Sequence, residues 1–171
     1  VIVAIIVIIM CIVMLKGILS KDTKQGKIVS KDYFASYQNN KWGVIDSNGD
    51  NVIDPSYAEM IIVPNSKNDV FLCTYDVDYD NNTYKTKALN SENKEIFTEY
   101  DSVEAIDNID KNNNLWYEKN VLKVCKNEKY GLIDFNGKEL LPIEYDEITT
   151  LDGMENSIII KKDGKVGLVN D

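Results

Sequence analysis

Acidic side chains are the most numerous groups in this chain that could take part in chemistry. The 171 residues include 28 acidic residues, 19 basic residues and no histidine, for a formal net charge of −9. The lack of histidine removes the commonest general base and the commonest zinc ligand. An acidic surface also repels nucleic acid, whose binding proteins need basic patches. We therefore expect no nucleic-acid partner, no metal ion and no cofactor.

Alternating aspartates at residues 76–80 resemble the opening of a calcium-binding loop. An EF-hand loop continues with a glycine and ends on a bidentate glutamate, but the chain has Asn81 and Lys87 at those positions. A β-hairpin with Asn81 and Asn82 as a two-residue turn explains the pattern better, because it sets acids opposite lysines. The predicted pairs are Asp78 with Lys85 and Asp76 with Lys87.

Paired carboxylates could serve a glycosidase, which needs two of them in unlike environments. The candidates are Asp46, Asp54, Asp134 and Glu144. Asp46 and Asp134 occupy the same place in two copies of one motif, so their surroundings should be alike. We expect that the chain is not an enzyme, and a carboxylate-based hydrolase is our third hypothesis for its function.

Aromatic side chains are the other candidates for a binding site. Trp116 and Tyr117 lie in a polar stretch, residues 112–118, that falls outside the repeated motif described below. Departures from a repeat are where repeat proteins place their binding surfaces. We predict binding at Trp116 and Tyr117, and at the hairpin tip formed by Asn81 and Asn82. Trp42 shares its repeat position with a valine, which indicates packing.

A repeated motif organises the chain. Residues 41–50 and 129–138 share one pattern, in which an aspartate and a glycine stand at the first and fourth positions of a turn. A worn copy covers residues 88–101, with Lys87 in place of the first motif glycine, and a fourth copy begins at Lys165. The motif residues are Trp42, Gly43, Asp46, Gly49, Tyr57, Tyr100, Tyr130, Gly131, Asp134, Gly137, Tyr145 and Gly167.

Each copy predicts a three-stranded β-meander. A strand precedes each motif and is joined to it by two residues that suit a tight hairpin turn: Asn39-Asn40, Asn81-Asn82, Asn127-Glu128 and Asp163-Gly164. The prolines at 55 and 142 should stop the last strand of their units. Such meanders could close like propeller blades or form an open solenoid. The expected fold is all-β, preceded by one transmembrane α-helix.

The motif resembles that of the bacterial WG-repeat family. The resemblance covers residues 30–171 and is strongest at residues 41–46, Lys-Trp-Gly-Val-Ile-Asp, and at residues 129–134, Lys-Tyr-Gly-Leu-Ile-Asp. It implies a domain of β-hairpin repeats with a binding role, often in surface or secreted proteins, and no catalytic residues. We expect this domain at 33–171, in units of about 33–63, 70–106, 115–151 and an incomplete 157–171.

The amino-terminal segment is strongly apolar. Residues 1–15 carry no charge, and about nineteen helical residues span the hydrocarbon core of a bilayer. Three interpretations stay open: an uncleaved signal anchor over 1–19, which we favour, a cleaved signal peptide, and a lipoprotein signal ending at Cys11. Residues 20–32 form a lysine-rich linker, whose charges favour a cytoplasmic side, whereas the repeat type favours the outside.

The sequence therefore predicts a non-catalytic binding or interaction module. It would be held in the cell membrane by residues 1–19 in a single pass, with the repeats on the extracytoplasmic side of a bacterial cell. Its partner would be an unknown protein. The alternative is a module that binds cell-wall glycan.

Overall fold

The computed structural model describes residues 32–170, and this part of the chain contains strands and no helix. The all-β prediction is confirmed. Among these residues there is therefore no helix that could cross a membrane. The predicted anchor, residues 1–19, and the linker as far as residue 31 lie outside the described residues.

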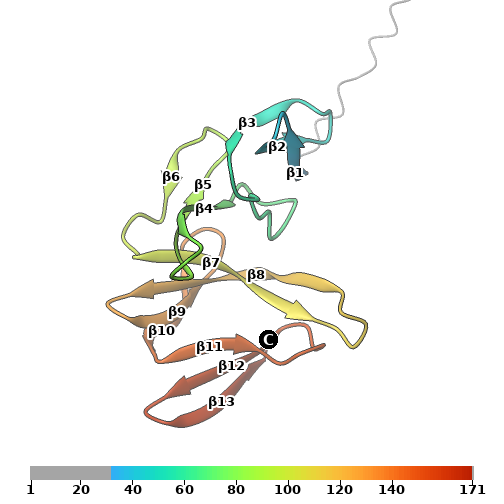
Figure 1. Cartoon of the computed structure of the whole chain (residues 1–171). Helices are drawn as coiled ribbons and strands as arrows, with labels where there is room; N and C mark the ends of the chain where they lie inside the picture. Colours follow the sequence, from blue (N-terminus) through green and yellow to red (C-terminus); the bar gives the residue numbers. More distant parts are fainter. Residues whose placement is uncertain (1–31, 171) are drawn as a thin grey trace, which may run out of the picture.

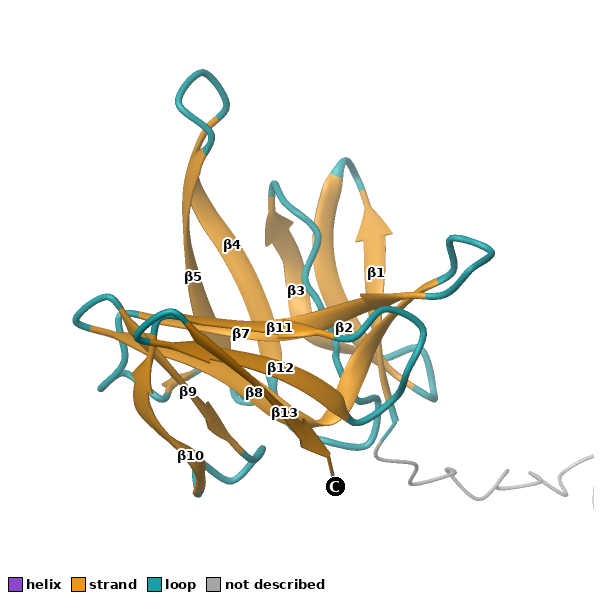
Figure 2. Ribbon diagram, turned by 90° about the horizontal axis from the view of Figure 1, so that it is seen from below, coloured by secondary structure: helices purple, strands orange, loops and turns teal. Residues whose placement is uncertain are grey.

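Four small antiparallel sheets follow one another in chain order along a curved array (Figures 1 and 2). Sheet 1 contains β1 (Tyr33–Gln38), β2 (Lys41–Asp46) and β3 (Asn51–Tyr57). Sheet 2 contains β4 (Phe71–Asp78), β5 (Thr83–Leu89) and β6 (Glu95–Ile96). Sheet 3 contains β7 (Ser102–Ile109), β8 (Leu115–Lys126), β9 (Lys129–Ile133) and β10 (Glu139–Tyr145). Sheet 4 contains β11 (Glu147–Thr150), β12 (Ser157–Lys162) and β13 (Lys165–Asn170).

The repeating unit has four strand positions, which we call A to D in chain order. Sheet 3 fills all four, sheet 1 holds B to D, and sheet 4 holds A to C. Sheet 2 holds B to D, and the isolated bridge between Ile62 and Leu72 stands at its A position. β7 and β11 are thus the first strands of sheets 3 and 4. The units predicted from the sequence, 70–106 and 115–151, instead placed these strands at the end of the preceding unit.

The aspartate that follows a D strand explains this grouping. The N–H of Asp101 donates to the carbonyl of Cys125 at 2.8 Å, and the N–H of Asp146 donates to that of Lys161 at 2.8 Å. Their carboxylates accept the N–H groups of Asn127 at 2.7 Å and Asp163 at 2.8 Å, in the turns of the next sheet. The chain therefore joins the following sheet directly after Tyr100 and Tyr145.

Three of the four two-residue turns form as predicted. Both turn residues have positive φ in Asn39-Asn40, Asn127-Glu128 and Asp163-Gly164, which is the geometry of a type I′ hairpin. Strand pairing closes directly beside each turn, as between Lys126 and Lys129.

The predicted β4–β5 turn was wrong. Its loop has four residues, 79–82, because the carboxylate of Asp78 accepts the N–H groups of Asp80 and Asn81 at 3.0 and 3.1 Å. A bulge before Asp78 then shifts the register, so Lys85 pairs with Tyr75 on the neighbouring strand. The structure has neither predicted ion pair: Lys85 bonds Asp76 at 3.0 Å.

The motif turns form as predicted. One carboxylate oxygen of Asp46 accepts the N–H groups of Asn48 and Asp50, at 2.8 and 3.1 Å, and Asp134 does the same for residues 136 and 138. Gly49 and Gly137 have φ of 80° and 84°, which suits glycine.

The prediction that proline stops the last strand was also wrong. β3 continues through Pro55, and β10 continues through the proline at 142, because each strand is at a sheet edge and bulges there. The bulge brings this strand onto the first motif glycine. A Cβ at Gly43 would lie 2.5 Å from the carbonyl oxygen of Ile53, and one at Gly131 would lie 2.9 Å from that of Leu141.

The core consists of three hydrophobic clusters, each between two successive sheets. In every cluster one residue of strand C meets two residues of the next sheet, one at position A and one at position B. These triads are Val44 with Ile61 and Phe71, Ala88 with Val103 and Leu122, and Leu132 with Ile148 and Ile158. All nine side chains are at most 5% exposed. The sheets therefore stack by one rule, used three times.

Trp42 is half-buried and packs against the first cluster, with its ring centroid 4.9 Å from that of Tyr37. Tyr130 packs against the third cluster in the same way. Val166, at the same repeat position, is 70% exposed.

Candidate functional site

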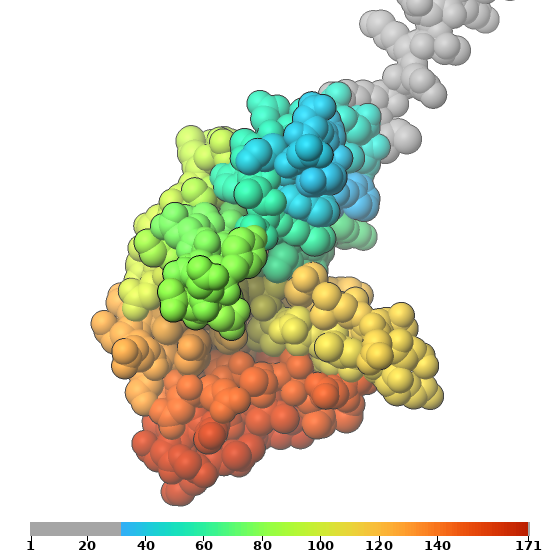
Figure 3. Space-filling view, viewed as in Figure 1, coloured from blue at the N-terminus to red at the C-terminus, as the bar shows by residue number. Residues whose placement is uncertain are grey.

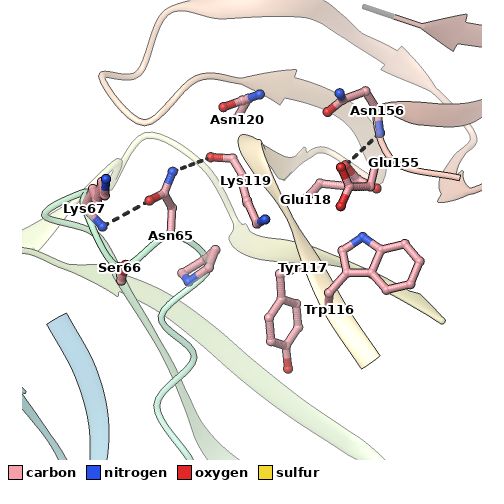
Figure 4. A pocket seen from close by; sticks show the side chains of 11 residues that line it. Asn65, Ser66, Lys67, Trp116, Tyr117, Glu118, Lys119, Asn120, Glu155 and Asn156 are labelled. Atoms are coloured by element: carbon pink, nitrogen blue, oxygen red, sulfur yellow. Dashed lines mark hydrogen bonds between the residues drawn. The ribbon is translucent and has the colours of Figure 1, made fainter. Parts of the chain in front are cut away.

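A cleft of about 450 Å³ lies where three segments from different units meet (Figure 4). The segments are the β3–β4 loop, the first half of β8, and the β11–β12 loop. We call it the β8 cleft. It is lined by Pro64, Asn65, Ser66, Lys67, Trp116, Tyr117, Glu118, Lys119, Asn120, Glu155 and Asn156.

A large bulge in β8 shapes the cleft wall. Asp107 faces Tyr117 and Ala105 faces Leu122, so a single β7 residue, Ile106, lies opposite residues 118–121. The strands at the same position in sheets 1 and 4 are regular. β1 pairs with β2 without a bulge, and β12 pairs with both β11 and β13 without a bulge. The cleft therefore forms where β8 departs from the repeat.

Two buried polar side chains hold the bulge against the next sheet. Asn108 and Glu118 are 1% and 3% exposed, and the Asn108 amide donates to the Glu118 carboxylate at 3.1 Å. Asn108 also donates to the carbonyl of Met154 at 3.0 Å and accepts the N–H of Gly153 at 2.9 Å. The second oxygen of Glu118 accepts the N–H of Asn156 at 3.1 Å. These bonds fix the β11–β12 loop as one side of the cleft.

The opposite side is fixed by Asn65. Its amide donates to the carbonyl of Lys119 at 2.9 Å, and its oxygen accepts the N–H of Lys67 at 3.0 Å. Figure 4 shows Asn65 and Lys67 across the cleft from Trp116 and Tyr117. The cleft is thus held open by hydrogen bonds from both sides.

Trp116 carries an unused donor. Its indole Nε1 is shielded from solvent and has no hydrogen-bond partner. A buried donor without an acceptor costs about 1–3 kcal/mol, so a turn of the ring that brought this N–H to an acceptor on a ligand would be favoured. The side chain as a whole is half-buried and lines the cleft.

Tyr117 lies between the β8 cleft and a second cavity of about 420 Å³. Figure 3 shows the surface hollowed between the β4–β5 hairpin (green) and the β7–β8 hairpin (yellow), which both line that second cavity. Burial, and then the charge of Asp107, raise the pKa of the Tyr117 hydroxyl. The hydroxyl therefore stays protonated at neutral pH and can both donate and accept.

The structure brings together only half of the predicted binding residues. Trp116 and Tyr117, both on strand β8, line the β8 cleft. Asn81 and Asn82 form the tip of the β4–β5 hairpin and do not line this cleft.

The four candidate hydrolase carboxylates lie elsewhere and have other contacts. Asp46 and Asp134 close their turns, Asp54 accepts the side-chain amide of Asn51 at 3.3 Å, and Glu144 pairs with Lys162 at 2.7 Å. None of them lines the β8 cleft. Glu118 does line it, but both of its oxygens already accept hydrogen bonds.

The sequence analysis missed Asn65, Asn108, Glu118 and Asn156. One signal could have found the region: the interval from Asn81-Asn82 to the turn at 127–128 is longer than the interval from that turn to the next one, at 163–164. That extra length includes the β8 bulge.

Comparison with known proteins gives one kind of match. Residues 42–64 and 130–165 match the family described as WG containing repeat. The first segment spans nearly all of β2 and β3, and the second runs from β9 to the start of β13. No curated protein and no solved structure matches the chain.

Proposed function

We propose that the chain, two segments of which match the WG repeat, is a non-catalytic binding module and that the β8 cleft holds its ligand. The observation that carries this proposal is the cleft itself, where an irregular strand interrupts regular repeats. Repeat proteins keep their scaffold constant and place binding groups where the repeat varies.

The ligand that the cleft suits is an extended, uncharged polar chain. Trp116 and Tyr117 offer aromatic surface, and the amides of Asn120 and Asn156 offer donors and acceptors beside it. A segment of a partner protein fits this description and is our first candidate. A cell-wall glycan is the second, favoured by the unused indole N–H of Trp116, which a hydroxyl or acetamido oxygen could accept.

We place this module at a bacterial cell surface. The proposal rests on the uncharged, apolar residues 1–15, which are long enough to anchor the chain together with residues 16–19. The repeats would then face outward and meet wall polymers and surface proteins.

Photochemical cross-linking would identify the ligand. A photoreactive amino acid in place of Asn120, on the cleft wall, should yield an adduct in intact cells. The same substitution at Asn48, in the exposed β2–β3 turn, is the control and should yield none. Adducts of equal yield at both positions, or at Asn48 alone, would remove the cleft as the binding site.

Fluorescence would test the glycan candidate. With Trp42→Phe, Trp116 is the sole tryptophan, and soluble wall fragments should change its emission. Trp116→Phe keeps an aromatic ring but lacks the N–H, so binding should weaken roughly 2- to 10-fold, the effect of one hydrogen bond. Unchanged Trp116 emission at saturating fragment would exclude the glycan and leave the protein partner.

Thiol labelling would test the membrane side. A cysteine at the exposed Asn113, with Cys73 and Cys125 replaced by alanine, should react with an impermeant reagent in intact cells. Labelling only after lysis would place the repeats in the cytoplasm.

A further inference from the structure

The second cavity, of about 420 Å³, opens between sheets 2 and 3, in the middle of the array (Figure 3). Leu72 and Val103, each 3% exposed, belong to the cluster that joins these two sheets, and both line the cavity. Further residues of the β4–β5 and β7–β8 hairpins form its two walls. Sheet 1 precedes these sheets in the chain and sheet 4 follows them, so neither end of the described residues borders the cavity.

Apolar surface continues from this floor to the mouth of the cavity. Leu115, at the start of β8, and Tyr84, on β5, both line the cavity and are each 56% exposed. Covering such exposed apolar side chains with a ligand is favourable, because it removes them from water. The two walls therefore suit a ligand group with a long apolar stem.

The charged side chains of the cavity leave one carboxylate without a counter-ion. Three line it: Glu104, Asp107 and Lys123. The Lys123 ammonium binds Glu104 at 2.9 Å and lies 5.5 Å from the ring centroid of Tyr130, so these two charges neutralise each other. Within residues 32–170, no lysine forms an ion pair with the Asp107 carboxylate. The cavity therefore has an unbalanced negative charge at Asp107.

Asp107 also has an aromatic ring beside it. The strand register places Asp107 directly opposite Tyr117, and cross-strand pairs put their side chains on one face of the sheet. Burial, and then the charge of Asp107, raise the pKa of the Tyr117 hydroxyl, which agrees with this placement. A carboxylate beside a tyrosine ring suits a guanidinium group, which can bond the carboxylate through two N–H groups and stack on the ring.

We propose that the second cavity holds the side chain of an arginine from an extended segment of a partner protein. Its guanidinium would bind Asp107 and stack on Tyr117. Its methylene groups would cover Leu115 and Tyr84. The formal net charge of −9 would attract a basic segment. A neutral glycan has no positive charge to offer Asp107, so this site favours the protein candidate.

The same segment would continue into the β8 cleft. Tyr117 lines both cavities, so a chain that passes it reaches the cleft from the second cavity. The residues on that side would be the uncharged polar ones proposed above, and in this respect the arginine site rests on the proposed function.

A titration followed by NMR tests the site on the full chain in detergent. The probe is N-acetylarginine methylamide, which should shift the amide signals of Tyr84 and Thr86 on one wall and of Leu115 and Tyr117 on the other. N-acetylcitrulline methylamide has the same shape without the charge. It should bind roughly 10-fold more weakly, the effect of a hydrogen bond to a charged group.

Asp107→Asn should weaken binding of the arginine probe by the same factor. Asp107 is exposed, and its bond to Thr150, at 2.9 Å, uses the backbone carbonyl, so the variant should fold. The matched control is Asp80→Asn, which removes the same charge from the exposed tip of the β4–β5 hairpin, outside the cavity. It should bind the probe within about 2-fold of the parent, because salt screens a distant charge.

Three results would overturn the proposal: equal binding of the two probes, equal losses in the two variants, or no shift at the four amides at the highest probe concentration. Tighter binding of N-acetylleucine methylamide would also overturn it, since the occupant would then be apolar. Cross-linking at Asn120 tests the β8 cleft separately, so failure of the proposed function can be told from failure of the arginine site.

Discussion

Sheets 2 and 3 differ at the position that faces their last strand, and we attribute the different lengths of those strands to it. In sheet 3 this position is Gly131, and β10 continues for seven residues, with its bulge lying directly on the glycine. In sheet 2 the position is Lys87, and β6 ends after two residues. The ammonium of Lys87 lies 5.3 and 5.8 Å from the ring centroids of Tyr75 and Tyr57.

The turn between the strands is the same in both sheets. Asn90 replaces the motif aspartate, and its side-chain oxygen accepts the N–H groups of Glu92 and Lys94 at 3.1 and 3.0 Å. Asn93 takes the place of the glycine with φ of 57°. The comparison teaches that the two motif glycines have separate roles: one permits the turn, and the other permits the last strand.

The largest effect should come from giving sheet 3 the residue of sheet 2. Gly131→Lys would drive a Cβ into the backbone of β10, so the strand must move away, at a cost of about 3 kcal/mol in unfolding free energy. Denaturant unfolding and amide exchange of residues 139–145 would measure this. Gly164→Ala, where a Cβ meets no atom within 4 Å, should cost about 1 kcal/mol because of its positive φ. Full protection of β10 in the lysine variant would refute the role assigned to Gly131.

A smaller effect should follow from breaking the buried pair of Asn108 and Glu118, which distinguishes the irregular strand β8 from the regular strands. Glu118→Leu leaves the N–H donors of Asn108 and Asn156 without their acceptor, at a cost of about 2 kcal/mol. The β11–β12 loop should then exchange its amide hydrogens faster. Glu139→Leu, at an exposed site on β10, is the matched control and should change stability little. Similar losses in both variants would mean that Glu118 does not anchor the loop.

The reverse exchange, Lys87→Gly, should change stability by less than about 1 kcal/mol. It removes the contacts of the ammonium with two tyrosine rings and adds chain flexibility, but it frees the space that the last strand needs. Amide protection of residues 97–100 should rise toward that of β10. If their exchange is unchanged, the short β6 has a cause other than Lys87.

The smallest effect concerns Asp146, the aspartate at the junction of sheets 3 and 4, whose hydrogen bonds to sheet 4 we call the aspartate clamp. The ammonium of Lys129, and then the N–H of Asp163, hold the pKa of Asp146 below its ordinary value. The clamp therefore contributes stability above the pKa of about 4 in the unfolded chain, and this contribution is lost as pH falls through the lower folded pKa. Asp146→Asn should melt lower at pH 7 and lose less than the parent between pH 5 and 2. Parallel melting curves across that range would exclude the clamp as a pH-dependent contact.

The sequence predicted the local chemistry of this fold well. Positive φ at paired asparagines and the capping of a turn by aspartate depend on neighbours within four residues, so the turns at 39–40 and 46–49 could be predicted. The register of β4–β5 could not, since it depends on whether Asp78 caps its loop or pairs across the hairpin. The course of the strand through Pro55 was missed because proline at a sheet edge loses no hydrogen bond.

The candidate site was half predicted for a similar reason. Trp116 and Tyr117 stood out by their type, but their role depends on a bulge whose partners, Asn108 and Asn156, come from other strands and loops. Nothing in the residues near Glu118 indicates that it is buried. The prediction used the pattern within one repeat, so it could not include contacts between repeats.

Each pair of successive sheets is held together by one small apolar triad, and this arrangement also determines how the array would respond to mechanical force. A pull on residues 33 and 170 loads the three clusters in series, since every sheet contains only strands that are neighbours in the chain. The hairpins within each sheet are loaded separately from those of the next. Under tension the array should lengthen in steps, one sheet at a time, and recover each step alone when the force is released.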